Sequence, residues 1–251
     1  MRLKHLLLSC LAGLAVAQQP PPKPPRFPYP EKLSYRVEWR LVTAGTVTVQ
    51  LSRPSPDHWQ LDLDLQSAGM VSRLYKVLDR YEVISNDHFC ASTSVLDAQE
   101  GNRHRLTRLT FENSRHKVEF DERDLTNNTT WKRVLDIAPC THDVAGALAA
   151  MRFMNVELGQ SATLPITDGK KMVNARVDAQ SRENVTIAGK TYDTIRYEAF
   201  LFDNVLYKRK GRLFIWLTHD ADRTPVQLRF QLGFPIGTIS LALNKQQKQG
   251  T

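Results

Sequence analysis

Hydrophobic and polar residues alternate with a period of two over much of this chain. Every second residue is apolar from Tyr35 to Leu41 and again from Val47 to Leu51, with a break at Ala44-Gly45, and the pattern returns from Trp59 to Leu65. Successive side chains of a β-strand point to opposite faces of the sheet, so this pattern predicts strands with one apolar and one wet face.

Further strand patterns continue to the C-terminal end. A hairpin is predicted over Arg103–Phe120, and loops over Ser52–Asp57 and Asp121–Arg133, where the sequence is polar. Strand signals then recur between turn residues such as Asp168-Gly169. The later segments are Ala162–Ile166, Met172–Val177, Val185–Ile187, Thr191–Phe200, Leu213–Leu217, Val226–Phe230 and Ile236–Leu243. The predicted fold is all-β and mostly antiparallel, a barrel-like or sandwich shell of about ten to twelve strands with one or two short helices.

Two segments have helical spacing instead. Apolar residues between Val71 and Leu78 predict a short helix at the end of the shell. The second helix is capped by Thr141 or Asp143, runs past Met151 and ends in the segment 155–159. Its alanines would let it pack closely on a sheet, and Gly146 weakens it slightly.

The N-terminus has the features of a signal peptide. Arg2 and Lys4 precede a short apolar run, and Ala15-Val16-Ala17 forms a small-residue cleavage site. The run is too short to span a bilayer, which takes about 20 apolar residues, and no later run approaches that length. Acylation at Cys10, as in a lipoprotein, is the alternative that we consider weaker, because more apolar residues follow Cys10.

The remaining chain divides by composition. We expect a signal peptide at residues 1–17, a proline-rich linker at 18–32, one β domain at 33–245 and a polar tail at 246–251. The net charge of +8 would fall to +6 with the loss of Arg2 and Lys4. A scattered positive charge fits a solvated surface. The export signal argues against nucleic acid as a partner.

Two cysteines would remain after cleavage. They are Cys90 and Cys140, an even count, and an oxidising compartment would favour a disulfide between them. The alternative is two buried thiols that never meet. The bond would close a loop of about 50 residues and stabilise the fold by roughly 3–4 kcal/mol.

Several motifs of the second half resemble one family in their order and spacing. They are Cys140-Thr141-His142-Asp143, Glu157-Leu158-Gly159-Gln160, Asp168-Gly169-Lys170, Ile215-Trp216-Leu217-Thr218, Asp222-Arg223-Thr224-Pro225-Val226 and Gly237-Thr238-Ile239. With the strands from about Tyr35 to Leu243, they resemble the secreted bacterial proteins called domain of unknown function 3108. The resemblance implies a periplasmic, mostly β fold without an assigned activity, and it supplies no catalytic residues.

Candidate chemistry is sparse. The dipeptides His142-Asp143 and His219-Asp220, with Asp222, contain metal-binding side chains, but they lack a recognised ligand spacing and occupy cap and turn positions. No nucleophile, phosphate-loop or dinucleotide motif is present, so we predict no metal, no cofactor and no catalytic residue, and we favour a binding protein over an enzyme.

Aromatic side chains give the best functional indication. Tyr35, Trp39, Trp59, Tyr197 and Trp216 fall mainly on strand faces that should point inward, where they either form the core or line a ligand cavity. Three hypotheses follow: an envelope protein that binds a lipid-like ligand or another envelope component, an envelope-polymer hydrolase using His142 or His219, and a structural or assembly factor. A lined cavity would favour the first, a converging His/Asp cluster in a cleft the second, and a filled interior with an exposed apolar patch the third.

Overall fold

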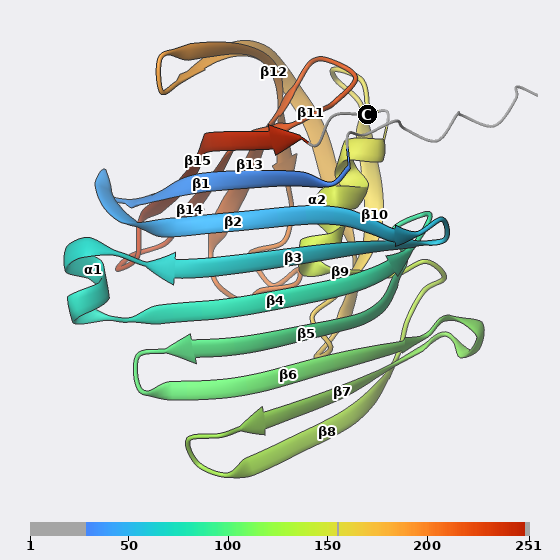
Figure 1. The fold of residues 1–251 in the computed structure, drawn as a ribbon. Coiled ribbons are helices and arrows are strands. Elements are labelled where there is room, and N and C mark those ends of the chain that lie inside the picture. Colours follow the sequence, from blue (N-terminus) through green and yellow to red (C-terminus); the bar gives the residue numbers. More distant parts are fainter. Residues whose placement is uncertain (1–28, 155, 249–251) are drawn as a thin grey trace, which may run out of the picture.

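A single sheet of fifteen strands dominates the computed structural model, which describes residues 29–154 and 156–248 (Figure 1). The fold class predicted from the alternation is confirmed, because the sheet is large, mostly antiparallel and not closed. The elements are β1 (Glu31–Trp39), β2 (Val42–Ser55), β3 (His58–Ser67), α1 (Gly69–Leu74), β4 (Val77–Asn86), β5 (Ala91–Glu100), β6 (Arg103–Glu112), the 3-10 turn η1 (Asn113–Arg115), β7 (Lys117–Asp124), β8 (Thr129–Asp136), β9 (His142–Asp143), α2 (Val144–Phe153), β10 (Ser161–Thr167), β11 (Met172–Ile187), β12 (Lys190–Ala199), β13 (Gly211–Thr218), β14 (Pro225–Leu232) and β15 (Thr238–Lys248).

The order of strands in the sheet follows the chain with one exception. Strands β8 to β1 form one meander and β15 to β9 form the other, and β1 pairs with β15 where the two meanders meet. All pairings are antiparallel except the two-residue contact of β9 with β10. The first and last strands thus lie side by side in the middle of the sheet, and β8 and β9 form its edges.

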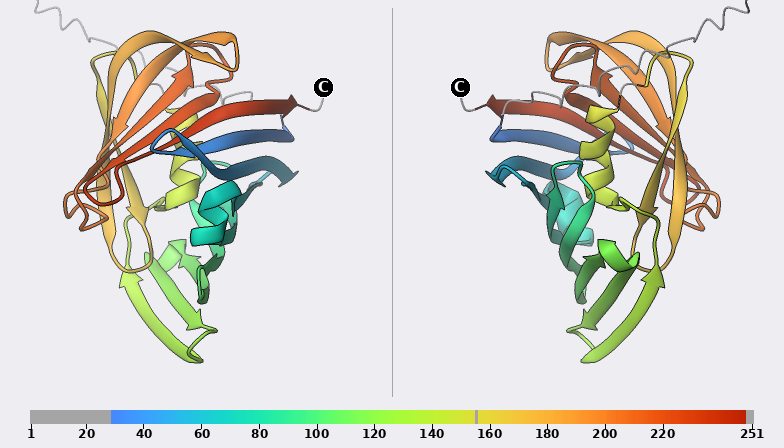
Figure 2. Two further views of the ribbon diagram at one scale, coloured as in Figure 1. Left: turned by 90° about the vertical axis from the view of Figure 1, so that its left-hand side faces the viewer. Right: turned by 90° about the vertical axis from the view of Figure 1, so that its right-hand side faces the viewer.

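The sheet curves around helix α2, which lies between the two meanders (Figure 2). Strand β1 shifts register against β15 at Ser34/Tyr35 and against β2 at Val37/Glu38. Bulges of this kind bend a strand and increase its twist, so those of β1 contribute to the curvature where the two meanders meet.

Side chains bridge the gap between the two edges of the sheet. Gly169, in the β10–β11 turn, packs so closely on Leu109 and Phe120 that an added Cβ would lie 2.3 Å from Phe120. Arg133 of β8 donates from Nη1 to the Lys170 carbonyl at 2.7 Å. These contacts build a second small core and close one side of the shell without strand pairing.

Helix α2 begins where the capping residues predicted. The Asp143 carboxylate accepts hydrogen bonds from the backbone N–H groups of Ala145 and Gly146 at 3.1 and 2.9 Å, so Asp143 is the N-cap. A Cβ at position 146 would lie 2.5 Å from Asp143 Oδ1. Gly146, which by propensity only weakens the helix, is therefore required by the cap.

The prediction of a loop over Asp121–Arg133 is wrong. Strand β7 continues to Asp124, and β8 begins at Thr129. Strand β8 is largely exposed on both faces and lacks the apolar alternation that marks half-buried strands. Lys132 pairs with Asp121 across the two strands at 2.9 Å, and Trp131 meets Phe120 edge-on at 4.9 Å, so charge pairs and a few apolar contacts together hold this edge. With β8 and the very short β9, the strand count reaches fifteen rather than ten to twelve.

Other expectations fall at or outside the ends of the described chain. Strands β1 and β15 take in Glu31 and Lys32 from the predicted linker and residues 246–248 from the predicted tail. The predicted signal peptide, Cys10 and linker residues 18–28 lie outside the described residues. Within the described residues, no helix is long and apolar enough to cross a bilayer.

Candidate functional site

An apolar cavity of about 460 Å³ lies between the concave face of the sheet and helix α2. Strands β1 to β6 contribute one wall and β10 to β15 contribute the other, and α2 reaches into the space with Ala145, Ala147 and Leu148. The walls are mainly leucine, valine and isoleucine, because the inward positions of the alternating strands carry these residues. Typical lining residues are Leu33, Val47, Val49, Leu61, Leu63, Leu65, Leu164, Ile166, Val177, Leu213, Ile215 and Leu228.

The small residues of α2 leave this space unfilled. The alanines at 145, 147 and 149 face the cavity, where a full-sized side chain would occupy part of it. Protein interiors normally contain few voids larger than a water molecule. A space of this size is therefore a feature of the fold, since the helix is built from residues too small to fill the concave sheet.

The cavity opens toward the end of the shell that carries α1. Leu65, near the end of β3, Phe230, near the end of β14, and Phe202, in the β12–β13 connection, line the cavity and remain partly exposed. Leu33 and Leu61, toward the other end, line it and are buried. The entrance thus lies among the turns near α1.

The opposite end is closed by aromatic rings. Trp59 stacks on Phe89 with ring centroids 5.0 Å apart, and Phe153 of α2 lies 4.2 Å from Phe89. Tyr29 meets Trp59 edge-on at 5.5 Å. Contacts of this geometry between large rings exclude water and fix the end of α2 against β3.

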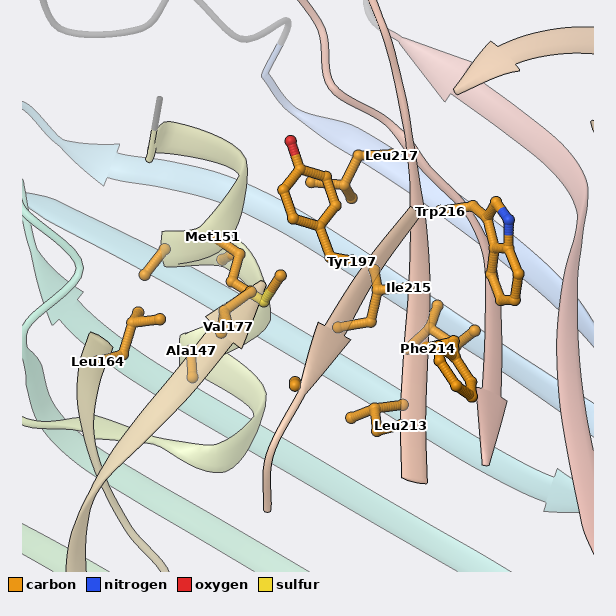
Figure 3. Packing of buried hydrophobic residues seen from close by; sticks show 14 of the residues in the cluster. Ala147, Met151, Leu164, Val177, Tyr197, Leu213, Phe214, Ile215, Trp216 and Leu217 are labelled. Atoms are coloured by element: carbon orange, nitrogen blue, oxygen red, sulfur yellow. The ribbon is translucent and has the colours of Figure 1, made fainter. Parts of the chain in front are cut away.

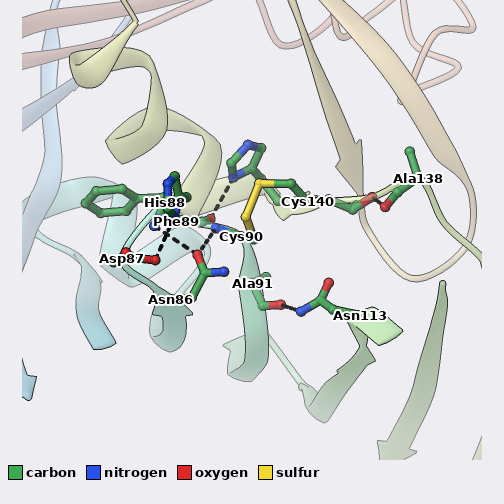
Figure 4. The surroundings of a disulfide bond; sticks show 11 residues. Asn86, Asp87, His88, Phe89, Cys90, Ala91, Asn113, Ala138 and Cys140 are labelled. Carbon is green, nitrogen blue, oxygen red and sulfur yellow. Dashed lines mark hydrogen bonds and ion pairs between the residues drawn. A yellow bond between two sulfur atoms is a disulfide. The ribbon is translucent and has the colours of Figure 1, made fainter. Parts of the chain in front are cut away.

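A disulfide pins the start of α2 to the first meander (Figure 4). Cys90, in the β4–β5 connection, bonds to Cys140, which precedes β9. The prediction of this bond is confirmed. Next to it, His142 donates from Nδ1 to the Phe89 carbonyl at 2.7 Å, and the Thr141 carbonyl accepts from the Ala91 N–H at 3.1 Å. The approach to α2 is thereby tied to the β4–β5 loop at three points.

A buried ion pair holds the other end of α2. Arg152 and Glu31 are 4% and 1% exposed, and Arg152 Nη1 lies 2.6 Å from Glu31 Oε2. Arg152 also donates from Nη2 to the Asp222 carbonyl at 2.9 Å, and Gln246 donates to Glu31 Oε1 at 2.8 Å. This network joins α2 to β1, to β15 and to the β13–β14 turn, so both ends of the helix are fixed.

Two carboxyl groups at the cavity have raised pKa values. Burial, with the nearby Glu100 charge, raises the pKa of Asp79 to about 6, and this side chain lines the cavity at the start of β4. Burial also raises the pKa of Asp143, to which the Tyr81 hydroxyl donates at 2.7 Å. The Asp143 carboxylate is already bonded as the N-cap of α2, whereas Asp79 is a polar group on the cavity wall near the entrance.

The five aromatic residues selected from the sequence lie in different places. Tyr35 lines the cavity and donates its hydroxyl to the Pro225 carbonyl at 2.7 Å. Trp59 belongs to the aromatic closure, and Trp39 donates from Nε1 to the Ile236 carbonyl at 2.7 Å. Neither lines the cavity.

The remaining two lie on β12 and β13 (Figure 3). Tyr197 is buried and donates to the Val156 carbonyl at 3.1 Å. Trp216 points to the face of β13 away from α2, where its Nε1 donates to Glu183. Neighbouring Ile215 faces the cavity instead. Tyr35 is thus the cavity residue among the five, and the aliphatic lining was not singled out by sequence.

The two His-Asp dipeptides are not brought together. Burial lowers the pKa of His142, and its ring is committed to the Phe89 carbonyl beside the disulfide. His219 lies in the exposed β13–β14 turn, 3.6 Å from Asp193. Among the described residues, no group of three or more His, Cys, Asp or Glu side chains is placed to hold a metal ion. The described residues therefore give the hydrolase hypothesis no assembled site.

The fold and the site together define the class of protein: a half-open β shell that holds a mostly aliphatic cavity beneath an internal helix. The chain belongs to the family described as "Protein of unknown function (DUF3108)", whose model matches residues 34–244. None of the curated proteins matches it.

Solved structures show a similar fold at low sequence identity. The crystal structure of a beta-barrel-like protein of domain of unknown function DUF1849 from Brucella abortus is 8% identical, with a TM-score of 0.58 over 90% of this chain and 100% of that chain. The hypothetical protein CT021 from Chlamydia trachomatis is 6% identical over 87% of this chain and 88% of that chain, and its TM-score of 0.27 is too low to indicate a shared fold. The first likeness supports the barrel-like architecture alone.

Proposed function

We propose that this protein is an exported, noncatalytic envelope protein whose cavity binds an apolar or amphiphilic molecule. The observation that carries the proposal is the aliphatic cavity of about 460 Å³ with its entrance near α1. This volume falls within the range of about 300–1,000 Å³ that is typical of small-molecule sites. A lined cavity also favours binding over the purely structural hypothesis, which expected a filled interior together with an exposed apolar patch.

The chemistry of the walls indicates what kind of ligand fits. Buried polar groups of a ligand need hydrogen-bond partners, and walls that are mostly aliphatic supply few. The buried charges at the cavity, Glu31 and Arg152, already bond to each other and to their neighbours. The ligand class is therefore a molecule with one or more alkyl chains, whose polar end stays near the entrance by Asp79.

Export is part of the proposal and has separate support. The sequence of residues 1–17 has the pattern of a signal peptide. Disulfides persist mainly in oxidising compartments, and Cys90 and Cys140 form one. The periplasm or cell envelope is the compartment that fits both observations.

Binding can be tested with a fluorescent long-chain fatty acid added to protein that has been stripped of bound lipid. We expect saturable binding that is lost in Leu148→Trp, because Leu148 projects from α2 into the cavity and a larger ring would occupy it. The matched control is Val134→Trp, on the exposed face of edge strand β8, which should bind as the wild type does. Equal binding by both variants, or no saturable binding by the wild type, would refute the proposal.

A further inference from the structure

Most of the exposed apolar side chains of the described chain gather around the cavity entrance. Eleven large hydrophobic side chains are exposed in the described chain, and six of them lie on three connections: β1–β2, α1 and β14–β15. We call these six the apolar rim: Leu41, Val42, Met70, Leu74, Tyr75 and Phe234. Phe234 and Leu41 are 96% and 94% exposed, and Leu74 and Met70 are 76% and 71% exposed. Scattered exposed hydrophobics are ordinary, but a group of them marks an interaction surface.

The three connections are held beside one another. The Arg40 N–H, in the β1–β2 turn, donates to the Thr238 carbonyl at 3.1 Å, and Trp39 donates to the Ile236 carbonyl of the β14–β15 loop. The Ala68 N–H, at the start of α1, donates to the Ala44 carbonyl of β2 at 2.8 Å. Figure 2 (left) shows these connections on the side of the shell facing the viewer, with α2 behind them. The rim is thus a fixed surface around the entrance.

Basic side chains surround the apolar rim. They are Arg40, Arg73, Lys76, Arg103, Lys208, Arg209 and Lys210, all exposed. The last three adjoin the β14–β15 loop, because the Gly233 N–H donates to the Lys210 carbonyl at 3.1 Å. In the described structure none of the seven takes part in an ion pair, whereas Glu100, the nearest acid of the β5–β6 turn, is paired with Arg105 at 2.9 Å. Asp203 is the exposed acid on the β12–β13 connection.

We propose that the apolar rim docks this protein on the surface of a membrane that contains anionic lipids. Exposed apolar side chains enter the boundary between headgroups and acyl chains, and basic residues beside them bind the anionic headgroups. A second copy of the chain fits this surface poorly, because a symmetric contact would place the same unpaired positive charges opposite one another. Docking would bring the cavity entrance against the lipid; that consequence alone rests on the proposed function.

The experiment is co-sedimentation with large vesicles, using protein in the form in which the expressing cell leaves it, with its N-terminus defined by intact mass. One set of vesicles is phosphatidylcholine, and the other is phosphatidylcholine and phosphatidylglycerol in equal parts. We expect the wild type to bind the anionic vesicles and to bind the neutral ones far more weakly. Raised salt should weaken the binding, since surface charges are screened.

Two pairs of variants separate the rim from the rest of the surface. Leu74→Ser with Phe234→Ser, and separately Arg73→Glu with Lys76→Glu, should each lower the vesicle partition coefficient by about tenfold or more. The matched controls are Val134→Ser with Leu158→Ser and Lys190→Glu with Lys245→Glu, all exposed and remote from the rim. Both controls should bind as the wild type does, and all variants should share its melting temperature, because surface changes of this kind alter stability little.

Three results would overturn the docking proposal. They are a wild type that ignores anionic vesicles, rim variants that bind as well as their controls, and a wild-type dimer that the rim serines dissociate without any vesicle binding. Fatty-acid binding without vesicle binding would refute the docking and leave the proposed function standing. Vesicle binding without fatty-acid binding would refute the proposed function and leave the docking standing.

Discussion

The two ends of the cavity are built on different principles. At the closed end, three aromatic rings, a disulfide and a buried ion pair fix α2 to strands from both meanders. At the open end, the lining side chains are partly exposed and the turns carry apolar residues in contact with water. The position of the helix and access to the cavity are therefore controlled separately. The closed end fixes α2 and so sets the volume of the cavity, and the open end determines which molecules can enter it.

The largest effect is expected from the disulfide at the closed end. Replacing both cysteines, as Cys90→Ser with Cys140→Ser, should lower the free energy of unfolding by roughly 3–4 kcal/mol, because the unfolded chain regains the freedom of a loop of about 50 residues. Urea unfolding of the oxidised and the reduced wild type provides the check. Reduction should reproduce the loss in the wild type and leave the double variant unchanged; a variant as stable as the oxidised wild type would contradict the role of the bond.

A somewhat smaller loss is expected at the buried ion pair. Glu31→Gln keeps the size of the side chain but removes the charge that faces Arg152, and should lower the free energy of unfolding by about 3 kcal/mol. The matched control is Asp136→Asn, since Asp136 pairs with Lys117 at 2.8 Å while 88% exposed, and no measurable loss is expected there. Equal effects of the two substitutions would show that α2 does not depend on this buried contact.

At the open end the expected effect is smaller and has the opposite sign. The pKa of Asp79 is raised from 3.8 to about 6, so the folded protein keeps a proton that the unfolded chain loses between about pH 4 and 6. Stability should therefore fall as the pH rises through that window, and the loss should persist at neutral pH. Asp79→Asn should raise the free energy of unfolding at pH 7 by about 1 kcal/mol, a value reduced for solvent screening of a half-buried group.

Urea titrations of the wild type and Asp79→Asn at pH 4 and pH 7 measure this difference. The two proteins should be nearly equal in stability at the lower pH and diverge at the higher one. A constant difference at both pH values would mean that the carboxyl is not desolvated at the entrance.

Much of the fold could be predicted from local patterns. The alternation from Tyr35 to Leu65 marks β1, β2 and β3, because each has one buried and one wet face. The cap of α2 could be narrowed to Thr141 or Asp143 from their position before the alanine-rich segment, and the structure identifies Asp143. Strand β8 could not be predicted in the same way, since this edge strand is largely exposed and polar side chains interrupt the apolar positions that would mark a half-buried strand.

The cavity was harder to predict than the strands around it. Alternation identifies Leu61 or Ile215 as inward-facing, but whether an inward position meets a filled core or a space depends on the curvature of the sheet and the distance to α2. The available signal was the run of alanines in α2, which limits how far the helix fills the shell. The large aromatic residues were the candidates for the cavity wall instead. Trp59 and Tyr197 pack in the core, and Trp216 lies on the other face of its strand.

The account depends on the cavity holding an alkyl chain in the native protein. Native mass spectrometry of protein purified without detergent, followed by solvent extraction of the same sample, measures this directly. We expect a population heavier than the polypeptide by a lipid-sized mass, which the extraction removes and recovers, and which Leu148→Trp lacks. A single population at the mass of the polypeptide, with no lipid in the extract and no uptake of added fatty acid, would contradict the account.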